Sequence, residues 1–129
     1  MKNRPILSTA KENYDNLAPT FVEYTEKILF GDIWRRENLS LRDRSLITIS
    51  ALITAEHLNQ LPYHLNLALE NGLSKEEIIE TITHLAFYVG WPRAASALDI
   101  IKKRRRKITS SSKLIIRIWN QANRWVRNI

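Results

Sequence analysis

The uncharged run from Leu46 to Ala55 constrains the fold of this chain more than any other feature. Every side chain in it is apolar, small or hydroxyl-bearing, so a helix here would carry no charge on any face. Such a helix needs protein around it on all sides. The helical pattern around the run covers residues 41–58 and opens with a capping signal at Ser40 to Asp43. We therefore predict a central helix, and a chain of 129 residues needs a neighbouring subunit to cover one side of it.

The residues before this helix indicate two shorter helical segments. Thr9 to Glu12 and Thr20 to Glu23 have the spacing of capping boxes, and Gly31 is placed to end the second segment. Trp34 is predicted to anchor the following connector onto the core. The side of the second segment that we expect to be buried consists of Phe21, Tyr24, Ile28 and Phe30.

Three further helices are predicted after the central one. The first covers 62–71 and stops at Gly72, the second opens with a capping box at Ser74 and stops at Gly90, and the third begins at Trp91. No segment alternates with the period of two that a strand needs, so we predict an all-α fold of about six helices. The predicted apolar faces are Leu61, Leu65, Ala68 and Leu69 on the first, Ile78, Ile79, Ile82, Leu85, Ala86 and Val89 on the second, and Ala94, Ala95 and Ala97 on the third.

A row of polar residues, His57, Gln60 and His64, borders this apolar framework. On a continuous helix, His57 and His64 would lie about 20° apart around the axis. Pro62 fits the first helical turn, so His57 and Gln60 are expected in the approach to the helix. The row suits a pocket wall, and imidazole exchanges protons near neutral pH. We do not predict a metal site, because the histidines lie across a helix boundary with only Glu56 as a nearby carboxylate.

Composition excludes several classes of function. The chain has no cysteine, which rules out disulfides, thiolate nucleophiles and Cys-ligated zinc. Its first residues lack the apolar run of a signal peptide, and no stretch approaches the roughly 20 apolar residues of a membrane span, so we expect a cytoplasmic protein. The net charge of +7 comes from the end of the chain, because all acidic residues precede residue 104. Any contact with nucleic acid or anionic membrane therefore concerns that end.

The predicted domain covers residues 1–103, and 104–129 form a basic amphipathic extension. Within the extension, residues 113–129 place apolar and tryptophan side chains on one helical face and most basic side chains off it. Three interpretations remain open for it: docking on a neighbouring subunit, weak contact with an anionic membrane surface, and a disordered tail. No specific nucleic acid is predicted as a partner.

The run from Leu39 to Leu98 resembles the carboxymuconolactone decarboxylase family, which shares its fold with the alkylhydroperoxidase AhpD. The resemblance covers about residues 20–103, and the motifs RDRSL, LPYHLNLALENGLSKEEI and HLAFYVGWP carry it. It implies an AhpD-like helical bundle that assembles into trimers or hexamers, with the active site near subunit contacts.

Two chemical branches of the family lead to different expectations. The peroxidase branch uses a Glu, a CxxC pair and a His. Aligned on His64, the Glu position holds Ser45, and the two Cys positions hold His57 and Gln60. Neither imidazole nor amide can form a disulfide, so thiol peroxidase activity is not expected. The decarboxylase branch needs no cofactor and implies decarboxylation of a small carboxylated lactone or related acid.

The resemblance and the chemistry together nominate site residues. His64 and His57 are the predicted catalytic acid/base groups, and arginines can bind a substrate carboxylate in a bidentate way. Each residue also has a structural interpretation, such as a hydrogen-bonded histidine, an arginine paired with Asp43 or Glu37, or a tryptophan that packs. A non-catalytic oligomer that binds a ligand or partner is the alternative function. The predicted substrate-binding residues are Gln60, Ser45, Arg42, Arg44, Arg93, Trp91 and His84.

Overall fold

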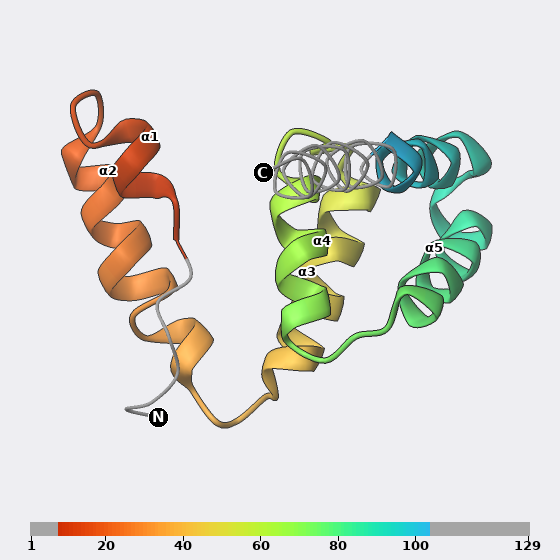
Figure 1. Ribbon diagram of the computed structural model, residues 1–129, viewed down its shortest axis with the longest axis horizontal. Helices are drawn as coiled ribbons and strands as arrows, with labels where there is room; N and C mark the ends of the chain where they lie inside the picture. Colours follow the sequence, from red (N-terminus) through yellow and green to blue (C-terminus); the bar gives the residue numbers. More distant parts are fainter. Residues whose placement is uncertain (1–7, 104–129) are drawn as a thin grey trace, which may run out of the picture. The chain divides into compact units, whose positions relative to one another are not determined.

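The computed structural model describes residues 8–103, and the chain divides between Ser45 and Leu46 into two compact units (Figure 1). Every regular element in the described residues is helical and none is a strand, which confirms the predicted all-α class. The extension 104–129, and with it the amphipathic stretch 113–129, lies outside the described residues. The division into a 1–103 domain and an extension therefore stays a prediction.

The first unit contains two short helices, α1 (Ala10–Tyr14) and α2 (Pro19–Tyr24). Both predicted capping boxes are wrong. Thr9 occupies the N-cap position of α1 without a side-chain cap bond, and the Oγ of Ser8 instead accepts from the N–H of Ala10 at 3.1 Å. In α2 the first helical position belongs to Pro19, which pre-sets the backbone, so Thr20 already lies inside the helix.

A π-helical turn, η1 (Thr25–Leu29), continues α2, and a 3₁₀ turn, η2 (Ile33–Arg35), follows. Trp34 is buried as predicted, and its ring stacks on that of Phe30 with centroids 5.8 Å apart. A Cβ on Gly31 would lie only 2.5 Å from the carbonyl oxygen of Lys27, so the end of the π turn has no room for a side chain.

The predicted buried side of this segment is largely wrong. Phe30 is buried, but Phe21, Tyr24 and Ile28 are each more than half exposed, and Val22 takes the inner position. The π turn adds a residue between hydrogen-bonded partners, because the N–H of Phe30 donates to the carbonyl of Thr25, five residues earlier. From Thr25 onward, a period of 3.6 residues therefore no longer describes which side chains share a face.

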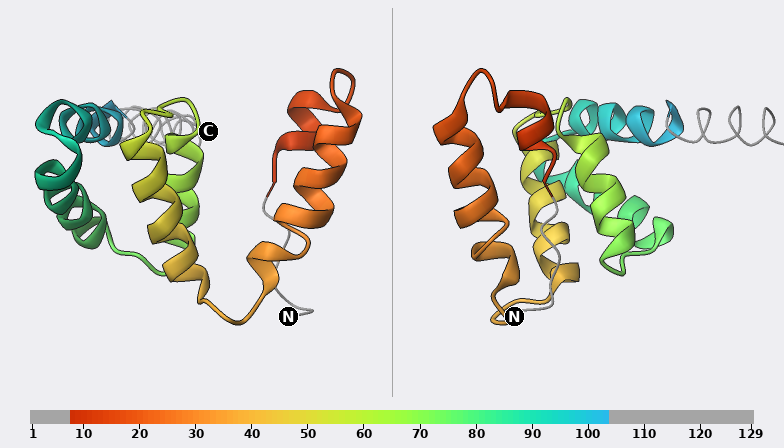
Figure 2. Two further views of the ribbon diagram at one scale, coloured as in Figure 1. Left: turned by 180° about the vertical axis from the view of Figure 1, so that it is seen from behind. Right: turned by 60° about the vertical axis from the view of Figure 1, so that its left-hand side comes forward.

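The second unit contains four helices: α3 (Leu41–Thr54), α4 (Leu61–Glu70), α5 (Lys75–Val89) and a helix at 91–103. The first residues of α3, up to Ser45, belong to the first unit. With α1 and α2 these make six α-helices in the described range, the number predicted. Helices α3 and α4 run side by side in opposite directions (Figures 1 and 2). None of the helices within 8–103 is long and apolar enough to cross a membrane.

Helix α3 begins as predicted, because the Oγ of Ser40 accepts from the N–H of Asp43 at 3.0 Å. It ends at Thr54, earlier than the predicted residue 58. Ile49 and Ile53 are fully buried, whereas Ile47 is 57% exposed. The chain by itself thus leaves one side of α3 open, as expected if the predicted neighbouring subunit covers that side. A covering subunit stays a prediction.

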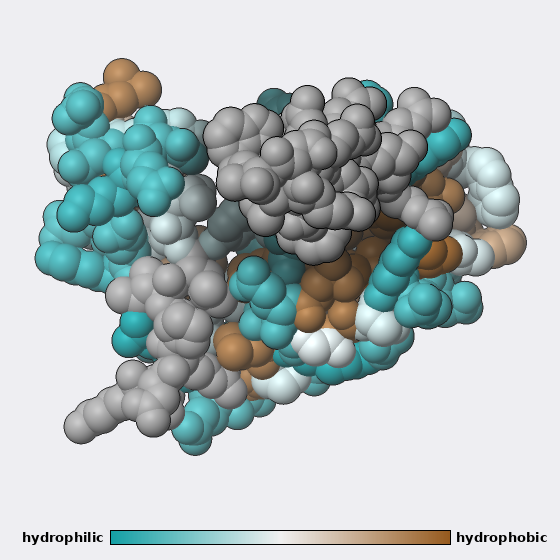
Figure 3. Space-filling model, viewed as in Figure 1, coloured by the Kyte–Doolittle hydropathy of each residue, from teal (hydrophilic) through white to brown (hydrophobic). Residues whose placement is uncertain are grey.

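The core of the second unit comes from all four helices, and apolar surface also reaches the outside of this unit (Figure 3). Most predicted apolar positions are inside, but Leu69, Ile79 and Ala95 are exposed, while Leu67 is buried. Residues 65–69 of α4 are nearly all apolar, so sequence periodicity alone does not choose between Leu67 and Leu69. The buried cluster consists of Ile49, Ile53, Leu61, Leu65, Ala68, Leu73, Ile78, Ile82, Ala86, Ala94 and Ala97.

Candidate functional site

The position of His57 is set by the way α3 ends. The N–H of Glu56 donates to the carbonyl of Ile53 at 3.2 Å, and the N–H of His57 donates to that of Leu52 at 2.9 Å. This pair of bonds is the Schellman motif, which needs a left-handed residue after the helix. Glu56 supplies it with φ of +58°. A side chain in that conformation costs roughly 1 to 2 kcal/mol, which is why glycine is the usual residue there.

His64 lies in the first turn of α4, after the residues that lead into the helix. Gln60 is the N-cap residue, and its carbonyl accepts from the N–H of His64 at 3.4 Å. His57 and Gln60 therefore precede the helix, as predicted, and both are exposed. That His57, Gln60 and His64 act together as one row stays a prediction.

The imidazole of His64 is half-buried and meets the ring of Tyr63 edge-on, with centroids 5.1 Å apart. Burial lowers its pKa below the ordinary value of 6.5, because the charged form loses hydration. Burial also raises the pKa of the Tyr63 hydroxyl, and the nearby carboxylate of Glu70 adds to this rise. At pH 7 the site thus contains a neutral imidazole beside a neutral phenol, and the imidazole can accept a proton.

Arg93 lies beside the turn that carries His57. Its Nη1 donates to the carbonyl of Val89 at 3.1 Å, which fixes the guanidinium near the start of the last helix. Its Nε is 3.7 Å from Oε1 of Glu56, and the two side chains are 42% and 58% exposed. An ion pair this exposed contributes about 0 to 1 kcal/mol. The structure therefore brings one of the predicted carboxylate-binding arginines to the residue next to His57.

Ser45, Arg42 and Arg44 belong to the first unit and stay predictions as substrate-binding residues. Ser45 is completely buried in the first half of α3. Arg42 pairs with Asp43 through Nη1 and Oδ1, 3.5 Å apart, which confirms the structural role considered for it. The Nη2 of Arg44 donates to the carbonyl of Arg36 at 3.1 Å, so this side chain joins the start of α3 to the connector before it.

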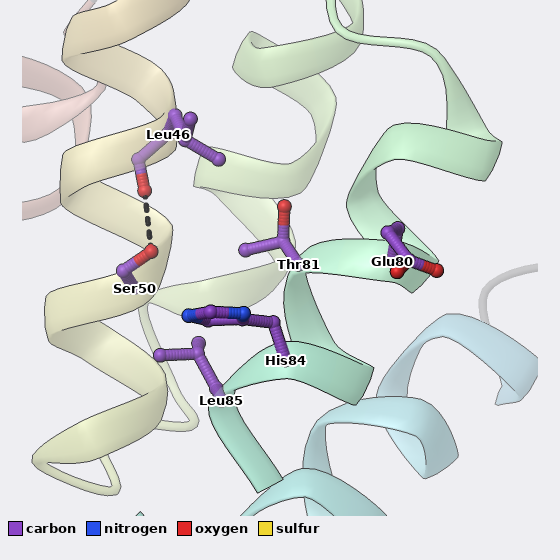
Figure 4. A pocket seen from close by; sticks show the side chains of 6 residues that line it. All are labelled: Leu46, Ser50, Glu80, Thr81, His84 and Leu85. Carbon is purple, nitrogen blue, oxygen red and sulfur yellow. Dashed lines mark hydrogen bonds between the residues drawn. The ribbon is translucent and has the colours of Figure 1, made fainter. Parts of the chain in front are cut away.

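A groove of about 340 Å³ lies between α3 and α5, and His84 is in its wall (Figure 4). The imidazole of His84 extends from α5 toward α3, and on one side it stacks on the ring of Tyr88, with centroids 4.9 Å apart. Trp91 is 64% exposed, so the chain alone does not support its packing interpretation. The residues lining the groove are Leu46, Ser50, Glu80, Thr81, His84 and Leu85.

Two hydroxyl groups in this groove donate their protons to backbone carbonyls. The hydroxyl of Ser50 donates to the carbonyl of Leu46, and that of Thr81 donates to the carbonyl of Glu77, each at 2.8 Å. Their oxygens can therefore only accept hydrogen bonds from a ligand. Ser50, Thr81 and Glu80 were not predicted as site residues. The spacing of Glu80 and His84 places them on one face of α5, but the approach of α3 is a tertiary feature.

Comparison with known proteins identifies the family. The sequence model of the carboxymuconolactone decarboxylase family matches residues 19–103, which include α2 to α5 and the histidine turn. The chain belongs to the carboxymuconolactone decarboxylase family. This confirms the resemblance inferred from the motifs, in a member without cysteine. Across residues 8–103, no three His, Asp or Glu side chains gather as metal ligands would.

Three relatives are similar to this chain, and the names of two of them state an activity. A 4-carboxymuconolactone decarboxylase of Acinetobacter baylyi is 29% identical over 71% of this chain and 69% of its own length. A nitrosuccinic acid decarboxylase of Metarhizium robertsii is 32% identical over 57% of this chain, which spans about half of that enzyme, 52%. An uncharacterised 15.0 kDa protein of Paracoccus denitrificans is 34% identical over 67% of this chain and 66% of its own length. At the level of the family, these likenesses support a decarboxylase-like protein.

Proposed function

We propose that this family member is a lyase that decarboxylates a small carboxylated lactone or a related acid without a cofactor. The observation that carries the proposal is the half-buried His64, whose lowered pKa keeps it neutral at pH 7, at the family position for the retained histidine. Membership of the family and the names of two relatives support the type of reaction. Thiol peroxidase activity, the other chemistry of the fold, has no cysteine to support it.

The two named substrates share a chemical feature. One is a lactone that carries a carboxyl group, and the other is a nitro derivative of succinic acid. When CO₂ leaves such a molecule, the electron pair of the broken carbon–carbon bond moves toward an electron-withdrawing lactone or nitro group. A proton must then be added to a carbon of the delocalised carbanion that results. The site therefore needs a cation for a carboxylate and a group that exchanges protons.

The second unit contains both kinds of group. Arg93 offers a guanidinium whose planar fork matches a carboxylate. His64 and His57 are the candidate acid/base residues, and burial makes the imidazolium form of His64 the stronger proton donor. Arg42, Arg44, Ser45, Gln60, Trp91 and His84 remain candidates for contacts with the rest of the substrate.

The proposal is tested by turnover of a panel of carboxylated lactones, β-keto acids and nitrosuccinate, followed by absorbance and CO₂ release. We expect turnover of at least one compound, and its loss in His64→Ala with an unchanged oligomeric state. His57→Ala shows whether the second histidine acts with it. Absence of turnover over the panel, or full activity of His64→Ala, would contradict the assignment.

A binding oligomer is the second candidate, and exposed apolar residues favour it. Phe87 and Tyr88 on α5 are both 77% exposed. The rings of Phe87 and Trp91 are in edge-to-face contact, with centroids 5.5 Å apart. A monomer rarely leaves so many aromatic side chains exposed together. We propose a homo-oligomer, a trimer or hexamer, with this surface in a subunit contact. Light scattering of wild type and of Phe87→Lys tests it, and a wild-type monomer would contradict it.

A cytoplasmic location and a weak contact of 113–129 with anionic membranes remain predictions.

A further inference from the structure

Glu56 holds a backbone conformation that the same chain elsewhere gives to glycine. Helix α4 ends in the same pair of bonds as α3: the N–H of Gly72 donates to Leu69, and that of Leu73 donates to Ala68. Gly72 has φ of +104°, and Glu56 has φ of +58°. A glycine would end α3 without strain. The carboxylate at position 56 therefore calls for an explanation beyond helix termination.

Stabilisation of the fold does not supply that explanation. The only ion pair of Glu56 among the described residues is the one with Arg93, at 3.7 Å. Both side chains are about half exposed, so solvent screens their attraction, and the pair does not outweigh the backbone strain. Strained residues of this kind concentrate at functional sites, where the strain is retained for a role in binding or catalysis.

Arg93 is held firmly on one side and loosely on the other. Its Nη1 donates to the carbonyl of Val89, but its buried Nε has no hydrogen-bond acceptor within the part of the chain that the structure describes. Oε1 of Glu56 is near enough for attraction and too far for a hydrogen bond. A carboxylate that approached more closely could take Nε and Nη2 together, in the bidentate geometry that arginine favours.

We propose that Arg93 is the carboxylate-binding residue of the site and that Glu56 is its displaceable occupant. A carboxylate of the ligand replaces the loosely held carboxylate of Glu56 and forms the two hydrogen bonds that Glu56 does not make. Glu56 thereby lowers the affinity of Arg93 for anions and admits only ligands that bind in the bidentate way. This inference deepens the proposed function and rests on it for the identity of the substrate.

Succinate is the probe, because it is a dicarboxylate that binds without needing turnover. Calorimetry measures its dissociation constant for the full-length wild type, Glu56→Gln and Arg93→Gln, at constant ionic strength. Glu56→Gln keeps the shape and the strained backbone but removes the competing charge, so we expect binding about twofold to fivefold tighter. Arg93→Gln should weaken binding about tenfold or more, because it removes a charged bidentate partner. Unchanged or weaker binding by Glu56→Gln would overturn the proposal.

Two controls separate this inference from a general effect of charge or folding. Asp99→Asn makes the same change of charge at an exposed position of the same helix as Arg93 and should leave succinate binding unchanged. Succinamide, the neutral analogue, should bind no more tightly to Glu56→Gln than to wild type. Arg93→Lys, which keeps the charge and loses the fork, should bind succinate more weakly than wild type does, and wild-type affinity in it would refute the bidentate mode.

The outcomes also distinguish this inference from the proposed function. If turnover depends on His64 while the dissociation constant of succinate is unchanged in the Glu56 and Arg93 variants, the inference fails and the decarboxylase proposal stands. If succinate binding responds as expected but no compound of the panel is turned over, Arg93 is a carboxylate site in a protein that does not decarboxylate. With an active substrate, Glu56→Gln should lower KM and leave kcat unchanged, a split that a purely structural role would not produce.

Discussion

The turn from Glu56 to His64 and the groove beside His84 are two histidine regions of the same unit with different physical settings. His64 is half-buried at a helix start, and burial alone lowers its pKa. His84 is exposed on α5, in the wall of a groove whose two hydroxyl oxygens can only accept hydrogen bonds. Arg93 lies beside the turn, whereas the groove contains Glu80. An arginine beside the turn attracts a carboxylate, whereas a glutamate in the groove repels one, so the turn is the more suitable place for an acidic ligand.

The largest expected effect is on catalysis, where substitution of His64 should reduce activity far more than substitution of His84. His64→Gln should reduce kcat/KM about 10²-fold to 10⁴-fold, the range for loss of a general acid or base. His84→Gln should cause a smaller loss, because the residues that line its groove include no lysine or arginine for a carboxylate. Steady-state kinetics on an active compound of the panel measures both. Equal losses in the two variants would erase the distinction, and a larger loss in His84→Gln would move the site into the groove.

The next largest effect is on stability, because the side chains that pack below the turn are more deeply buried than those that line the groove. Leu65, on the same helix as His64, is 1% exposed in the core, so Leu65→Ala should cost about 2 to 5 kcal/mol of unfolding free energy. Leu85 in the groove is only partly buried, and Leu85→Ala should cost less. Urea unfolding followed by circular dichroism gives both values. Similar costs would mean that the groove is as tightly packed as the core below the turn.

The ends of α3 and α4 provide a smaller and opposite pair of effects. Glu56→Gly should raise the free energy of unfolding by about 1 kcal/mol, because glycine removes the strain of the left-handed conformation. Gly72→Ala places a side chain at φ of +104° and should lower that free energy by about 1 kcal/mol or more. Denaturant unfolding of the two variants measures the pair. If Glu56→Gly proved destabilising, the ion pair with Arg93 would contribute more than its exposure suggests.

The smallest expected effect concerns pH. The unfolded chain binds a proton at His64 near pH 6.5, and the folded chain binds it only at lower pH. Stability from this group is therefore fully present above about pH 6.5 and is lost as the pH falls from that value through the lowered pKa of the folded state. His64→Gln should flatten this dependence in thermal unfolding between about pH 7 and 5. His84→Gln serves as the matched control and should leave the contribution of His64 in place.

Features that depend on a few neighbouring residues were predictable. The capping box of Ser74 forms as predicted, with its Oγ accepting from the N–H of Glu77 and the Glu77 carboxylate accepting from the N–H of Ser74, each at 3.0 Å. Gly72 and Gly90 end their helices with positive φ, and His57 and Gln60 precede α4. The two failed boxes of the first unit show the limit of this reasoning. A suitable spacing of side chains does not ensure the backbone angles that a cap needs.

Contacts between helices were not predictable from the sequence. Periodicity suggested Leu69 where the structure buries Leu67, and it suggested Phe21, Tyr24 and Ile28 where the structure buries Val22. The groove needs Ser50 of α3 and His84 of α5, which are far apart in the chain. Glu56 had drawn attention only as a possible metal ligand. Its contact with Arg93 depends on the packing of the last helix against the end of α3.

The sequence alone determined the helical class, the family, the absence of thiol chemistry and the stops of α4 and α5, because these depend on composition, motifs and bonds that span five residues or fewer. Tertiary structure decided which apolar side chains are buried, the lowered pKa of His64 and the pairing of Arg93 with Glu56. Burial and ion pairs need groups from distant parts of the chain. Their geometry arises only when the helices pack.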